Sequence, residues 1–89
     1  METISLQVTY RKGRPFAAYI YMHRRPGDKA ARTEEVRPDL LVDYGEDGRV
    51  LGIEIVTPQA VAVEDVLEVF DTLGLARPAE AELAPLRAA

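Results

Sequence analysis

The fold of this chain is constrained most by residues 40–57, in which a short polar turn separates two apolar runs (LLVDYGEDGRVLGIEIVT). An Asp-Gly pair between apolar runs, here Asp47-Gly48, is among the strongest short-range signals of a β-hairpin. In the second run Leu51, Ile53 and Ile55 share one face, because successive strand residues point to opposite sides. Gly52 lies on the other face, where it predicts either a bulge or a neighbouring ring lying across the strand.

Residues 3–10 (TISLQVTY) and 16–23 (FAAYIYMH) predict two further strands joined by a tight basic turn. The first segment alternates strictly between apolar and polar residues, which is typical of a half-buried strand. The second is apolar or aromatic on both faces, so it predicts a strand covered on both sides or lying in a subunit interface. Residues 30–36 (AARTEEV) predict a short edge strand whose charges discourage pairing with other chains.

An amphipathic helix is predicted over residues 63–73, with an apolar stripe at helical spacing and Gly74 as its C-terminal cap. A second short helix is expected over residues 79–83, with Pro85 limiting its length. The first helix is expected to cover an apolar sheet face, whose members are Ile4, Leu6, Val8, Phe16 and Ile20. The prediction is therefore an α+β fold: an antiparallel sheet of four or five strands with one helix packed on one face. We expect a single domain over residues 1–76 and a C-terminal helical tail over residues 77–89.

Size and composition narrow the class of protein. A chain of 89 residues forms one domain with a thin core, and such domains often gain stability from disulfides, metals or a partner subunit. With no cysteine and a single histidine, His23, disulfides are excluded and a zinc site is disfavoured, which leaves self-association. No apolar run is long enough to span a membrane and no secretory signal is evident, so a cytoplasmic protein is expected.

Charge is distributed unevenly along the sequence. Residues 1–38 contain eight basic and four acidic residues, and residues 39–89 contain three basic and eleven acidic ones, which together give the net charge of −4. Such asymmetry indicates either oriented association with a charged partner or ordinary drift of surface charge along a small protein.

Several of these segments together resemble a family of small prokaryotic proteins, domain of unknown function 2283. The resemblance covers about residues 8–57 and is carried by ARTEEV (31–36), LVDY (41–44), DGRVLGIEI (47–55) and the tyrosine strand AYIYM (18–22). The chain departs from the family pattern in one place: the turn at residues 11–14 is basic, whereas family members usually have an acidic turn there. The resemblance implies a small antiparallel sheet with a helix and no established catalytic residue. Because some members occur beside small toxin-like proteins, it also implies an antitoxin-like partner role.

The densest acids offer two kinds of candidate site. Asp43, Glu46, Asp47 and Glu54 could supply oxygen ligands to calcium or magnesium, but their spacing matches no EF-hand and a solvated hairpin turn is favoured. Glu54 alone, in an apolar strand, could act as a general base. We favour a solvent-facing role or an ion pair with a cross-strand Arg or Lys, because no nucleophile or second acid–base group accompanies it.

The second predicted strand supplies the candidate binding residues. Tyr19, Tyr21 and His23, followed by Arg24 and Arg25, could stack on nucleobases and hold phosphates. The alternative is that Tyr19, Tyr21, His23 and Val56 line a face that is buried against a second copy, and it is favoured because the chain is acidic overall.

From the sequence we therefore expect no catalytic, cofactor-binding or metal-binding residue. The leading hypothesis is a non-catalytic protein–protein interaction module, antitoxin-like in one version, that forms a homodimer and binds a small basic protein. Nucleic-acid binding through Tyr19, Tyr21, Arg24 and Arg25 is the alternative.

Overall fold

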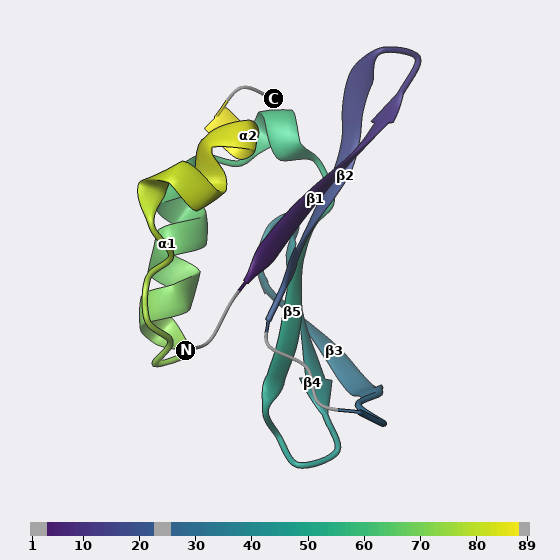
Figure 1. Ribbon diagram of the computed structural model, residues 1–89, viewed down its shortest axis with the longest axis vertical. Helices are drawn as coiled ribbons and strands as arrows, with labels where there is room; N and C mark the ends of the chain where they lie inside the picture. The colour runs from purple at the N-terminus through teal and green to yellow at the C-terminus, as the bar shows by residue number, and fades with distance from the viewer. Residues whose placement is uncertain (1–3, 23–25, 88–89) are drawn as a thin grey trace.

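The computed structural model describes residues 4–22 and 26–87, in which a five-stranded antiparallel sheet carries all the helical segments on one face (Figure 1). The strands are β1 (Ser5–Arg11), β2 (Arg14–Tyr21), β3 (Ala30–Arg37), β4 (Leu40–Gly45) and β5 (Val50–Ile55). They are followed by the 3-10 turn η1 (Pro58–Ala60), helix α1 (Val63–Thr72), the 3-10 turn η2 (Glu80–Leu83) and helix α2 (Ala84–Arg87). In space the strand order is β1-β2-β5-β4-β3. The predicted α+β class is confirmed.

The predicted hairpins form as their turn residues require. Lys12 and Gly13 join β1 to β2, and both have the positive φ that favours two-residue hairpin turns. Between β4 and β5 the Gly45 amide donates to the Arg49 carbonyl at 2.8 Å, and Gly48 takes a φ of +84°. The edge strand predicted over residues 30–36 is confirmed, since β3 lies at one edge of the sheet, pairs along β4 and extends one residue further, to Arg37.

The core lies between the sheet and the helical layer. From the sheet it contains Ala18, Ile20, Leu40, Val42, Ile53 and Ile55, and from the helical segments Val63, Val66, Val69, Phe70, Leu83 and Leu86. The end of α1 is capped as predicted, with the Leu75 amide donating to the Phe70 carbonyl and the Gly74 amide to that of Asp71. Arg37 in β3 reaches Asp65 at 3.3 Å and Glu68 at 2.6 Å, which fixes the helix over the far edge of the sheet.

Phe16 is not covered by the helix, contrary to the prediction. Its residue is 51% exposed, because the β1–β2 hairpin extends past the helical layer (Figure 1). The Arg11 guanidinium lies 4.6 Å from the centre of the Phe16 ring and covers part of it. Alternation gives the face on which a residue lies, but it does not say how far along the strand the opposing helix reaches.

The second helical segment, predicted over residues 79–83, is longer than expected. Residues 80–83 form η2, and the chain continues directly into α2, which contains Pro85 as its second residue. A proline in the first helical turn is tolerated, since its missing N–H would have no partner there, so Pro85 does not end the helix. Leu83 and Leu86 are buried at 1% and 4% exposure against the core.

Candidate functional site

The face of the sheet opposite the helices brings together the predicted binding residues of the described chain. Strand register aligns Gln7, Tyr19, Glu54, Leu41 and Glu35 in one row and Ser5, Tyr21, Gly52, Asp43 and Thr33 in the next. We call this surface the open face. The described helical segments all pack on the other side (Figure 1).

Tyr19 is held in place by a glycine and a carboxylate on two neighbouring strands. Its ring lies so close to Gly52 that a Cβ added there would be 2.2 Å from the tyrosine oxygen. Its hydroxyl donates to Asp43 Oδ2 at 2.6 Å, and the Thr33 hydroxyl donates to Oδ1 of the same carboxylate at 2.5 Å. The sequence prediction of a ring lying across Gly52 is therefore correct. β4 and β5 also have a bulge beside this glycine, between Asp43 and Tyr44.

Tyr21 completes an aromatic pair on the open face. The two ring centres lie 4.6 Å apart with the planes tilted by 51°, and the Tyr21 hydroxyl donates to Gln7 Oε1 at 3.1 Å. Val56, just beyond β5, is 39% exposed. The predicted interface also included His23, and the predicted nucleic-acid contact included Arg24 and Arg25. These three residues lie outside the described part of the chain.

Among the described residues, those that carry a charge in the middle of the open face are all acidic. Glu54 is half-buried and lies opposite Tyr19 on one side and Leu41 on the other, so neither residue directly opposite it is the Arg or Lys of the ion pair that the sequence left open. Asp43 lies on the neighbouring strand β4, and Glu35 lies on β3, one strand further. The open face therefore combines tyrosine rings with negative charge. Both features attract cationic groups on the surface of another molecule.

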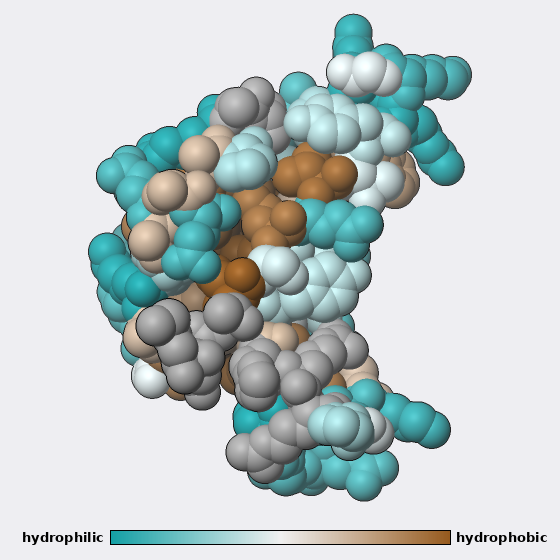
Figure 2. Space-filling view, in the orientation of Figure 1, coloured by the Kyte–Doolittle hydropathy of each residue, from teal (hydrophilic) through white to brown (hydrophobic). Residues whose placement is uncertain are grey.

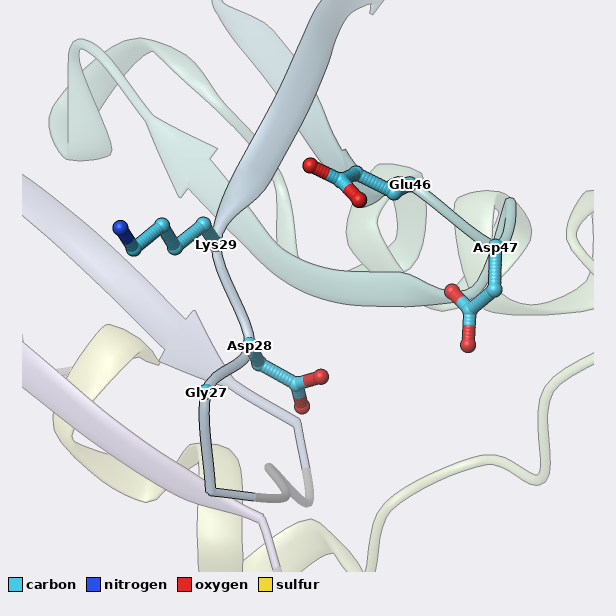
Figure 3. A pocket seen from close by; sticks show the side chains of 5 residues that line it. All are labelled: Gly27, Asp28, Lys29, Glu46 and Asp47. Carbon is cyan, nitrogen blue, oxygen red and sulfur yellow. The ribbon is translucent and has the colours of Figure 1, made fainter.

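The structure separates the four acids that the sequence grouped as one possible cation site. Asp43 and Glu54 lie on strands of the open face, whereas Glu46 and Asp47 lie in the β4–β5 turn. There they line a cavity of about 260 Å³ together with Gly27, Asp28 and Lys29 (Figure 3).

The charge in this cavity is largely paired within the protein. Arg49 contacts Asp28 at 2.7 Å and Asp47 at 3.5 Å, and the hydrogen bond from Arg49 to Asp28 raises the pKa of the guanidinium. The backbone N–H of Arg49 donates to Asp47 at 3.0 Å and lowers the pKa of that carboxyl. Among residues 4–22 and 26–87 no group of three or more metal-ligating side chains could hold an ion.

The side chains that hydrogen-bond around the two tyrosines form what we call the open-face network. The sequence did not predict that Gln7 and Thr33 belong to it, nor that Asp43 has a structural role in it. Gln7 reaches Tyr21 across the β1–β2 hairpin, and Thr33 donates to Asp43 on the next strand along the chain. Asp43 meets Tyr19 only because β2 pairs with β5, a strand distant in sequence.

Asp43 lies opposite Gly52 only because of the bulge between Asp43 and Tyr44, so the spacing of the turn alone does not predict this contact. Thr33 carried no signal in the sequence, because its position depends on the register of β3.

The fold and the open face define a small α+β domain with an antiparallel sheet, one face of which is covered by none of the described helical segments (Figure 1). Residues 17–57 match the model of a family described as proteins of unknown function, DUF2283. The match confirms the resemblance in the sequence and includes β3, β4, β5 and both tyrosines. No curated protein and no solved structure matches the chain. Within the described residues, none of the helices has the length and apolar character needed to cross a bilayer.

Proposed function

We propose that this protein is a non-catalytic protein–protein interaction module that presents the open face to its partner. The observation that carries the proposal is the tyrosine pair on the sheet face that no described helical segment covers, fixed by the Gly52 contact and by the hydrogen bond to Asp43. Rigid aromatic side chains are effective binding anchors, because they bury large areas and lose little conformational entropy. The lack of cysteine supports a cytoplasmic setting.

The charge of the open face favours a small basic protein as the partner. A homodimer through this face would bring Glu35, Asp43 and Glu54 of one copy near the same acids of the other, which opposes association. A basic partner would instead pair with them and cover the tyrosine rings. This arrangement suits an antitoxin-like role, in which an acidic chain occupies and neutralises a small basic protein.

The same acids weigh against nucleic-acid binding. A tyrosine platform binds single strands when cations beside it hold the phosphates, and here Glu54 lies opposite Tyr19 and Asp43 accepts its hydroxyl hydrogen bond. Phosphates close to these carboxylates would be repelled. Protein binding is the function that the described part of the face supports best.

The test is capture of a small basic protein by the wild-type chain from its native host, followed by affinity measurements with charge-reversed variants. Glu54→Lys should weaken binding of the purified partner by about tenfold or more, because it places a cation in the middle of the interface. Glu46→Lys is the matched control, since it makes the same change in the β4–β5 turn, away from the open face. The proposal fails if no basic protein is captured, or if the two variants bind the partner equally well.

A further inference from the structure

The two edges of the sheet differ in a way that matters for association. β3, at one edge, carries four charged residues: Arg32, Glu34, Glu35 and Arg37. β1, at the other edge, has no charge from Ile4 to Tyr10, and in the described chain it pairs only with β2. Natural sheets protect their free edges with charges, so β3 is a protected edge and β1 is an edge ready to pair.

An apolar strip follows the exposed edge of β1. Ile4, Leu6 and Val8 alternate along the strand, pack against the core and remain half-exposed. In the orientation that places β1 toward the viewer, Figure 2 shows hydrophobic surface between the helical layer and the sheet. Beside the start of the strand the surface is hollowed by a groove of about 120 Å³, lined by residues that include Ile4, Met22 and Leu75.

We propose that two copies of this chain pair antiparallel through β1, with Gln7 on the two-fold axis, to form one continuous ten-stranded sheet. The uncharged part of this edge runs from Ile4 to Tyr10, and Gln7 is its central residue. Centring the pair on Gln7 uses this whole segment, with Ser5 opposite Thr9 and Leu6 opposite Val8 of the other copy. Apolar residues then meet apolar residues on the helix side, and polar residues meet polar ones on the open face.

The two ends of β1 are complementary, which favours a second copy over an unrelated strand. Tyr10 is 57% exposed and, in this register, lies opposite Ile4 of the other copy, at the groove. Two charged residues line this groove: Glu82, and Arg77, whose charge is countered by its ion pair with Asp71. The strand end beyond Tyr10 carries Arg11 and Lys12. Antiparallel pairing therefore brings the basic end of one strand toward Glu82 of the other copy at both ends of the contact.

Residue 7 allows a direct test, because in a two-fold pair it faces itself. Gln7→Lys and Gln7→Glu, each alone, should raise the dimer dissociation constant by about tenfold or more, since like charges then lie directly opposite. An equimolar mixture of the two variants should recover the dimer, because opposite charges then meet. Sedimentation velocity at low salt measures all three samples, and circular dichroism confirms that each variant is folded.

The control is Gln59→Lys, which makes the same substitution at an exposed glutamine in η1 and should leave the dimer unchanged. Three results would overturn the proposal: a wild-type chain that sediments as a monomer throughout the micromolar range, Gln7 variants that dimerise like wild type, or a mixture that stays monomeric. The experiment does not involve the open-face partner, so its failure is distinct from failure of the proposed function.

Discussion

The contact between Tyr19 and Gly52 shows how one missing side chain shapes the open face. A glycine in the middle of a strand costs conformational entropy and leaves a gap in the row of side chains. Here the gap is filled by the ring of Tyr19 from the neighbouring strand, whose hydroxyl reaches one strand further to Asp43. The aromatic anchor of the proposed interface therefore depends on an absent Cβ.

Gly52→Ala should displace the Tyr19 ring and break its hydrogen bond to Asp43, because the new Cβ would lie 2.2 Å from the tyrosine oxygen. The ring can rotate away, so we expect a loss of about 1–2 kcal/mol in the free energy of unfolding rather than misfolding. Urea denaturation followed by circular dichroism measures the loss.

A double-mutant cycle supplies the control for this substitution. In a Tyr19→Ala background the alanine at position 52 meets no ring, so its cost should fall to within about 0.5 kcal/mol of zero. Equal costs in the two backgrounds would show that Gly52 matters for its backbone and not for the ring above it.

At the scale of elements, most of this fold could be predicted from local patterns. Alternation placed the strands, the Asp-Gly turn placed the β4–β5 hairpin, and the apolar stripe with Gly74 placed α1. The open-face network could not be predicted, since Tyr19 reaches Asp43 only through the pairing of β2 with β5, two strands that are distant in sequence. The exposure of Phe16 was missed for a related reason, because it depends on where the helical layer ends.

The tail is predicted to stabilise the whole fold, since Leu83 is 1% exposed and belongs to the hydrophobic core. Leu83→Ala should lower the free energy of unfolding by about 2–4 kcal/mol through lost burial and a residual cavity. Leu67→Ala, at a half-buried position of α1, should cost less. Chemical denaturation of both variants shows which substitution lowers the free energy of unfolding more. A smaller loss for Leu83→Ala than for Leu67→Ala would mean that residues 77–89 form a separate tail.

The ion pair between Asp71 and Arg77 joins the end of α1 to the segment that leads into the tail. Both carboxylate oxygens are engaged, at 2.9 and 2.5 Å, and the hydrogen bonds from Arg77 lower the pKa of Asp71 below its ordinary 3.8. A depressed pKa stabilises the fold above the unfolded-state pKa, and this contribution is lost as the pH falls through the folded-state value.

Asp71→Asn should therefore be less stable than wild type at neutral pH and equal to it in acid. The stability difference should begin to shrink near pH 4 and vanish below the folded-state pKa of Asp71, as measured by urea midpoints across the acid range. The effect should be small, because both side chains are about half exposed, at 52% each. A difference that stays constant down to the acid limit would assign the effect of the substitution to something other than this charge.

Over the whole molecule, apolar surface is left on one edge and aromatic surface on one face. Residues 4–22 carry three basic side chains and no acid, whereas the remainder of the described chain is strongly acidic. Pairing through β1 would cover the apolar edge and leave both open faces on the same side of the joined sheet. The dimer and the partner site would then use different surfaces and could be occupied together.

If the folded unit is a β1-paired dimer, its thermal stability must depend on protein concentration. Association contributes about 1.4 kcal/mol for each tenfold increase in concentration, which for two chains of this size shifts the melting temperature by roughly 3–5 °C. Gln7→Lys, which places like charges on the two-fold axis, should melt at a lower temperature than wild type at the same concentration, by at least the shift that a tenfold dilution of wild type produces. Scanning calorimetry over a hundredfold range of protein concentration compares wild type with Gln7→Lys. A wild-type melting temperature that stays constant over this range would show that the exposed edge of β1 contributes nothing to stability.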